Sequence, residues 1–93
     1  MTDNTIFVGN KPFMNYVTAV VMQFSTHKAN EVRIQARGKF ITRAVDVAEV
    51  ARRKFLENVD VSKIEIGSEE YEDTEDKAVR VSTISIVLQK KTP

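Results

Sequence analysis

The sequence contains no cysteine and no tryptophan, and only one of its 93 residues is a histidine. Without cysteine the chain can form neither a disulfide framework nor a thiolate zinc site. The single histidine, His27, has no second soft ligand with which to share a metal ion, so we expect no metal and no cofactor. The absence of cysteine also suits a reducing compartment, and we expect a cytoplasmic protein.

Long hydrophobic runs are missing as well. The longest run, Val20–Met22, is bounded by Gln23 and preceded by an interruption at Thr18, so we expect neither a signal peptide nor a membrane span. A chain of 93 residues is too short for two independent cores, which predicts one domain over residues 1–93. Its 42% hydrophobic and 29% charged residues are ordinary proportions for a globular domain.

Patterns that support catalysis are also absent. No glycine-rich phosphate loop with its lysine occurs, and no Ser/His/Asp or Cys/His set can be assembled. Asp46 and Glu49 lie three residues apart, but arginines at helical spacing around them favour surface ion pairs over a catalytic carboxylate pair. We therefore expect a binding protein and not an enzyme.

The net charge of +1 conceals an uneven distribution of charge along the chain. Residues 1–63 carry ten Lys and Arg against six Asp and Glu, whereas residues 64–93 carry four against seven. Six of the eight residues from 69 to 76 are acidic, namely Glu69, Glu70, Glu72, Asp73, Glu75 and Asp76. The first two thirds of the chain can therefore carry a basic face, but a polybasic tail is excluded.

Hydrophobic periodicity predicts the element order β-α-β-α-β-β. The predicted strands are Thr5–Val8, Val32–Ala36, Lys63–Gly67 and Val79–Leu88. Helices are predicted from about Pro12 to Thr26 and from Thr42, as the cap, to about Leu56. The segment between the last two strands, Ser68–Lys77, is expected to form a long hairpin projection. This order predicts an α/β (α+β) two-layer sandwich, with a mixed four-stranded sheet and both helices on one face.

The second predicted helix has a wider apolar stripe than one core contact requires. Its main face carries Ile41, Ala44, Val45, Ala48, Ala51 and Phe55. Val47 and Val50 form a second strip beside that face. The surplus predicts a dimer or dimer–dimer interface that includes Val47, Val50 and Phe55. For Phe55 the alternative, that it closes the core of the monomer, is equally open.

Three blocks of sequence cover nearly the whole chain. The first, Val8–Val17, contains Gly-Asn-Lys-Pro followed by Met-Asn-Tyr. The second, Ala36–Asp46, begins Ala-Arg-Gly-Lys-Phe-Ile, and the third, Arg80–Ile86, begins Arg-Val-Ser-Thr-Ile. In this order they resemble the Alba family of archaeal chromatin proteins, whose signatures are Gly-Lys-Lys-Pro with Met-Asn-Tyr, Ala-Arg-Gly-Arg-Ala-Ile and Arg-Val-Ser-Thr-Ile.

The resemblance implies a homodimer that binds double-stranded DNA at the backbone and minor groove through basic loops, assembles further on DNA, and is associated with the chromosome. The nucleic-acid contacts that it implies are Asn10, Lys11, Arg37, Lys39, Arg43, Lys77 and Arg80. Elementary physics favours several of them independently. A helix N-terminus attracts anions beside Lys11, and Gly9 and Gly38 permit close backbone approach. In a dimer, eight cations come from two copies each of Lys11, Arg37, Lys39 and Arg43. If about half of them touch phosphate, log K should fall against log salt with a slope of roughly −4.

Two departures from the family pattern change the expected binding. Asn10 replaces the lysine on which the family's acetylation switch acts, so we expect no regulation of that kind. The acidic residues 69–76 should be repelled by phosphate unless Lys77 and Arg80 lead the hairpin. We therefore predict weaker or more site-selective binding than that of an abundant chromatin coat.

Two alternative functions stay open. The same loops could straddle an A-form helix, which would make the chain an RNA-binding protein or a ribonucleoprotein subunit. The chain could instead be an interaction domain that docks a basic protein through its acidic hairpin.

Overall fold

The computed structural model describes residues 4–91. Its elements are β1 (Thr5–Phe7), α1 (Phe13–Ser25), β2 (Glu31–Arg37), a 3-10 turn η1 (Gly38–Phe40), α2 (Ile41–Val50), a π-helical turn η2 (Ala51–Phe55), β3 (Val59–Glu72) and β4 (Ala78–Lys90). The predicted order β-α-β-α-β-β is confirmed. Within residues 4–91, no helix is both long enough and apolar enough to cross a membrane.

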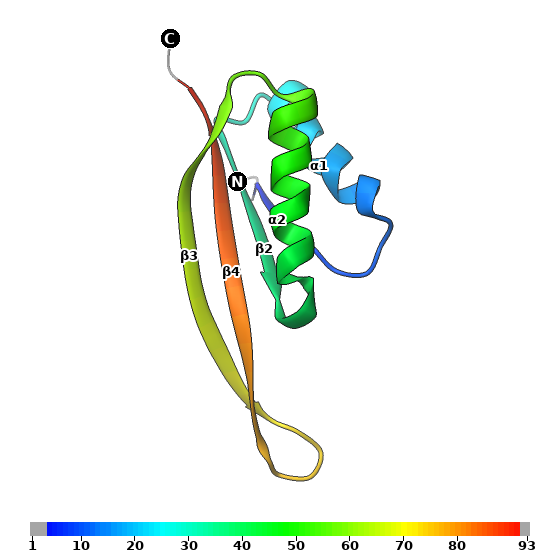
Figure 1. Cartoon of the computed structure of the whole chain (residues 1–93), viewed down its shortest axis with the longest axis vertical. Coiled ribbons are helices and arrows are strands. Elements are labelled where there is room, and N and C mark those ends of the chain that lie inside the picture. Colours follow the sequence, from blue (N-terminus) through cyan, green and yellow to red (C-terminus); the bar gives the residue numbers. More distant parts are fainter. Residues whose placement is uncertain (1–3, 92–93) are drawn as a thin grey trace.

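The four strands form one mixed sheet in the order β1-β2-β4-β3. β1 and β2 are connected through α1 and lie parallel, because a helix crossover returns the chain in the same direction. β4 is antiparallel to both β2 and β3. The helices lie on one face of this sheet (Figure 1), which confirms the predicted fold class.

The core lies between the helices and the sheet. Residues of β2 alternate, so that Val32, Ile34 and Ala36 are buried beneath the helices while the intervening side chains lie on the opposite face. α1 contacts β1 and β2, and α2 contacts β2 and β4. The largest fully buried side chains are Ile34, Leu88, Val17, Val20, Val32 and Val47. Each such side chain contributes about 1.5–3 kcal/mol of burial free energy, so this layer accounts for the fold's stability.

Several predicted element boundaries differ from the structure. Pro12 occupies the N-cap position of α1 and is not its first helical residue. Thr42 is not a cap, because η1 starts the helical path three residues before α2 and Thr42 lies inside it. β3 runs from Val59 to Glu72 rather than from Lys63 to Gly67, so residues 68–72 pair with β4 and only 73–77 form the hairpin tip. The acidic residues of this stretch do not favour a strand by themselves, and the strand forms because they pair with β4.

A β-bulge divides β3 into two parts. Val61 pairs with Leu88 and Lys63 with Val87, so Ser62 is an extra residue in the strand. The Ser62 hydroxyl donates to the carbonyl of Val87 at 3.3 Å. Beyond the bulge, Ile64 pairs with Ile86 on the face of the sheet that the helices occupy.

The hairpin tip is held by one aspartate. A carboxylate oxygen of Asp73 accepts hydrogen bonds from the backbone N–H groups of Glu75 at 2.9 Å and Lys77 at 3.0 Å. Asp76 adopts a positive φ of 59°, which aspartate tolerates better than most residues. Asp73 and Asp76 thus determine the conformation of the hairpin tip.

Candidate nucleic-acid interface

Two basic segments leave the sheet at the same edge. Because β1 and β2 are parallel, the residues that follow them emerge at neighbouring positions of one edge. Residues 9–12 lead from β1 into α1, and η1 leads from β2 into α2. Figure 1 shows both connections toward the end of the molecule to which the β3–β4 hairpin extends. The structure therefore brings the exposed residues Asn10, Lys11, Arg37 and Lys39 to this edge.

The N-termini of both helices also lie at this edge. Neither α1 nor the helical path that η1 begins and α2 continues has a side-chain cap or an acidic residue in its first turn, so the first N–H groups of each path are uncompensated. In the part of the chain that the structure describes, no carboxylate is within ion-pairing distance of Lys11 or Lys39. The ammonium group of Lys39 lies 5.5 Å from the ring centre of Phe40. Lys11 and Lys39 are thus free to bind an anion.

Gly38 fixes the shape of the second basic segment. Its φ of +59° lies in the left-handed region, where a side chain costs about 1–2 kcal/mol. Gly9 has no positive φ, and a Cβ there would lie 3.4 Å from the hydroxyl of Tyr16, an ordinary contact. The backbone conformation therefore requires glycine at position 38 and not at position 9.

A Gly38→Ala variant is expected to lose about 1–2 kcal/mol of unfolding free energy, because the methyl group forces the residue out of its native conformation. Chemical denaturation monitored by circular dichroism measures this loss. Gly9→Ala is the matched control and should change stability much less. Equal stability of the two variants would contradict the role given to Gly38.

Arg43 does not point freely into solvent. Its Nη1 donates to the carbonyl oxygen of Gly9 at 2.6 Å, and its guanidinium lies 5.7 Å from the ring centre of Tyr16. The hydroxyl of Tyr16 in turn accepts a hydrogen bond from the backbone N–H of Lys11 at 3.0 Å. The side chain of Arg43 is therefore held in place by contacts within the chain.

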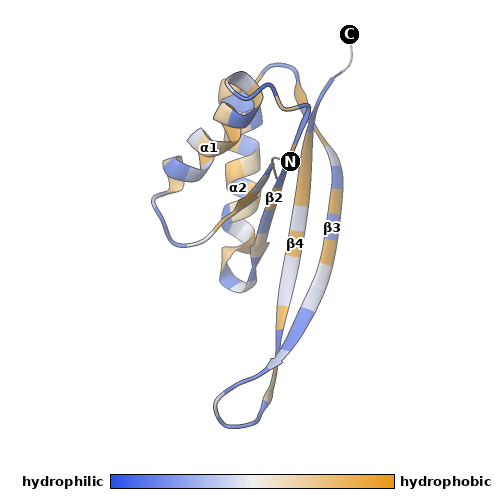
Figure 2. Ribbon diagram, turned by 180° about the vertical axis from the view of Figure 1, so that it is seen from behind, coloured by the Kyte–Doolittle hydropathy of each residue, from blue (hydrophilic) through white to orange (hydrophobic). Residues whose placement is uncertain are grey.

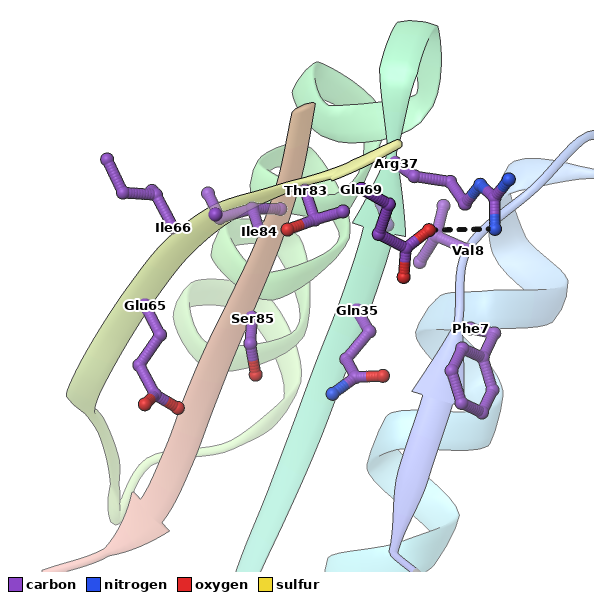
Figure 3. A pocket seen from close by; sticks show the side chains of 12 residues that line it. Phe7, Val8, Gln35, Arg37, Glu65, Ile66, Glu69, Thr83, Ile84 and Ser85 are labelled. Carbon is purple, nitrogen blue, oxygen red and sulfur yellow. Dashed lines mark ion pairs between the residues drawn. The ribbon is translucent and has the colours of Figure 1, made fainter. Parts of the chain in front are cut away.

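The other three predicted contact residues are paired with acids of the hairpin. Arg37 Nη1 lies 3.1 Å from Glu69 Oε1, a pair that crosses β4 and is drawn as a dashed line in Figure 3. Arg80 Nη2 lies 2.7 Å from Glu70 Oε2. The ammonium of Lys77 is 3.8 Å from Glu75 Oε1. These pairs are exposed, and each contributes only about 0–1 kcal/mol, so a stronger anion can displace the carboxylate.

The face of the sheet opposite the helices carries a hollow of about 420 Å³ (Figure 3). Phe7, which is 68% exposed, lines one side of it. The Arg33 Nη1 group donates to Glu65 at 2.9 Å, and this bond, aided by the charge of Lys63, lowers the pKa of Glu65. Because its arginines are balanced by glutamates, this face offers no excess positive charge. Apart from Arg37, which lies beside the two basic segments, this face is not part of the candidate interface.

The predicted subunit-contact residues of the second helix have different environments. Val47 is completely buried in the monomer core, so it has no surface to offer to a partner. Val50 is half-buried and packs against that core. Phe55 is 52% exposed, which shows that the alternative of a core-closing Phe55 is wrong.

The acidic residues of the second helix behave as surface charges. Glu49 accepts hydrogen bonds from Arg52 at 2.6 Å and from Arg53 at 2.7 Å, as the helical spacing predicted. The bond from Arg53, followed by that from Arg52, lowers the pKa of Glu49. A carboxylate held ionised by two arginines is a poor general base. The predicted ion pairs are thus confirmed for Glu49, whereas Asp46 has no ion pair within residues 4–91.

Comparison with known proteins identifies relatives over almost the full chain. The family model described as Alba matches residues 4–68. The “DNA/RNA-binding protein Alba 1” of Archaeoglobus fulgidus is 54% identical over 91 residues, covering 98% of this chain and 100% of the relative. The “DNA/RNA-binding protein Alba” of Methanoculleus marisnigri is 58% identical over 86 residues, which are 92% of each chain. The solved structure of Alba from Thermoplasma volcanium superposes with a TM-score of 0.85 at 45% identity, covering 92% of this chain and 99% of that one. The chain therefore belongs to the Alba family.

Proposed function

We propose that the protein is a dimer that binds double-stranded DNA by its backbone and minor groove, with Lys11 and Lys39 as the principal phosphate contacts. The observation that carries this proposal is the placement of two unpaired lysines at two uncapped helix N-termini on one edge. The names of the relatives, which denote nucleic-acid-binding proteins and not enzymes, support it. Association with the chromosome in the cytoplasm follows from such binding.

A second copy of the chain is the partner that best fits the uncovered part of β3. Ile64 is 59% exposed and Ile66 is 83% exposed, although both lie on the helix-bearing face of the sheet. Figure 2 shows hydrophobic bands along β3, the strand farthest from the helices. Exposed isoleucines on an edge strand favour association with another copy. A symmetric dimer built there would double the number of free lysines.

The acidic residues of the β3–β4 hairpin should make DNA binding weaker or more selective. Phosphate must displace Glu69 before Arg37 can contact DNA, and it must approach the other acids of the tip. Narrow minor grooves attract arginine strongly, so sites with that shape should release Arg37 most readily. Selection by groove shape is thus the expected form of specificity.

The experiment that tests the proposal is an electrophoretic shift of one DNA duplex across a salt series. Two free lysines per protomer give four phosphate contacts per dimer, so log K should fall against log salt with a slope of roughly −3.6. This value is close to the slope expected from the sequence. A flat salt response would contradict a backbone-binding function. Absence of binding at low salt would favour an interaction domain.

RNA is the second candidate ligand, because the names of the relatives include it. Competition between the duplex and a structured RNA of equal length separates the two ligands. DNA should be the stronger competitor if the loops read a narrow minor groove, which A-form RNA does not offer.

Replacing Glu69 by glutamine is expected to strengthen DNA binding by up to about fivefold per protomer. The substitution frees Arg37, and an exposed ion pair is worth about 0.2–1 kcal/mol. Titration of the same duplex at low salt measures the change. Glu72→Gln removes a charge from the same strand without releasing Arg37, so it serves as the control. Equal gains for both variants would show general repulsion and no specific competition.

A further inference from the structure

A continuous set of contacts connects the first basic segment to both helices. On one side of Asn10, the carbonyl of Gly9 accepts a hydrogen bond from Arg43 of α2 at 2.6 Å. On the other side, the N–H of Lys11 donates to the hydroxyl of Tyr16 of α1 at 3.0 Å. The guanidinium of Arg43 lies against the ring of Tyr16, 5.7 Å from its centre. Two side chains thus fix the backbone on both sides of residue 10.

The burial of these two side chains determines what they can do. Tyr16 is only 8% exposed, so its ring cannot stack on a base or reach a groove. Arg43 is half-buried, and it uses one donor on a carbonyl at the distance of a charge-assisted hydrogen bond. Its charge also interacts favourably with the face of the tyrosine ring. Neither residue is placed as a principal phosphate contact.

We infer that Tyr16 and Arg43 are positioning residues that hold Lys11 at a fixed place relative to Lys39. Lys39 lies in η1, which runs directly into α2, the helix that carries Arg43. Anchoring the Gly9–Lys11 backbone to α2 therefore makes one rigid unit of the two basic segments. A rigid pair of lysines binds two phosphates without the entropic cost of ordering a loop. This inference rests on the proposed function and names the residues that set the geometry of the same site.

A double-mutant cycle tests the inference on the full chain. Tyr16→Phe keeps the buried ring and removes only the hydroxyl, so the fold should remain intact. The duplex is titrated at low salt with wild type, Tyr16→Phe, Lys11→Ala and the double variant. Tyr16→Phe should weaken binding by about three- to tenfold, the worth of one hydrogen bond. It should have no further effect when Lys11 is already alanine, because its influence acts through Lys11.

The salt dependence provides a readout that a purely structural role would not change. Tyr16→Phe alters no charge, yet it should lower the salt slope toward that of Lys11→Ala. Arg43→Lys keeps the charge but loses the planar guanidinium that reaches both Gly9 and Tyr16, so it should weaken binding similarly. Arg53→Lys, on a residue paired with Glu49 outside both basic segments, is the matched control and should bind like wild type.

The outcomes separate this inference from the proposed function. If Tyr16→Phe weakens binding equally with lysine or alanine at position 11, the positioning role of Tyr16 is overturned. If Arg43→Lys binds like wild type, the positioning role of Arg43 is overturned. If Lys11→Ala itself leaves binding unchanged, the proposed function fails, whatever Tyr16 does.

Discussion

Replacing Lys11 and Lys39 together by alanine is expected to remove most of the affinity for duplex DNA and most of its salt dependence. Four phosphate contacts per dimer imply that wild-type affinity falls about a hundredfold between about 50 and 200 mM salt. The double variant retains the cations that the chain itself has paired, so its affinity should start low and change little. Electrophoretic titration at several salt concentrations measures both effects.

The control for this prediction is a pair of lysines at the other end of the molecule. Lys28 follows α1 and Lys90 ends β4, so Lys28→Ala with Lys90→Ala removes the same charge far from the two basic segments. That pair should bind nearly like wild type. If it loses as much affinity as the Lys11 and Lys39 pair, binding depends on overall charge and the proposed edge is not the site.

Replacing both Ile64 and Ile66 by serine is expected to convert the proposed dimer into monomers. Four isoleucines per dimer would lose their burial, which removes about 4–8 kcal/mol and weakens the dimer at least about a thousandfold. The fold should persist, because both side chains lie outside the core. Size-exclusion chromatography with light scattering gives the mass, and the same sample should bind DNA more weakly since the two pairs of lysines are no longer linked.

Phe7→Ser is the corresponding control for the dimer. Phe7 is 68% exposed but lies on the face of the sheet opposite the helices, so its replacement should leave the dimer intact. A monomeric wild-type protein would contradict the proposed assembly directly. Dissociation by Phe7→Ser would instead place the interface on the open face.

Local pattern was sufficient to predict the fold. Periodicity identified both helices, and short β-rich segments identified every strand, because each depends on residues close in sequence. The length of β3 was not predictable from the acidic residues 68–72, whose strand conformation depends on pairing with β4. The π-helical turn that ends the second helical segment also has no local signature in Ala51–Phe55.

The candidate site was predictable in its residues but not in their partners. Lys11 and Lys39 were predicted from the resemblance to the Alba family, and the glycines and the helix start beside them supported that choice. The pairing of Arg37 with Glu69 depends on the registers of β2 and β3 against β4, which sequence alone does not reveal. The sequence signature that includes Tyr16 gives no sign of the hydrogen bond that its hydroxyl accepts from the backbone N–H of Lys11. The wide apolar stripe of the second helix did not indicate a subunit interface at Val47, because the monomer core buries that side chain as well.

The bulge at Ser62 determines which face of the sheet each side chain of β3 beyond it occupies. Because the bulge takes Ser62 out of the ladder, Val61 and Lys63 pair with consecutive residues of β4. If Ser62 paired with Val87 instead, every residue of β3 beyond it would move to the opposite face of the sheet. The isoleucines would then move to the open face, and Glu69 would turn away from Arg37. The bulge at Ser62 therefore determines both which surface of β3 faces the proposed second subunit and which acid lies against Arg37.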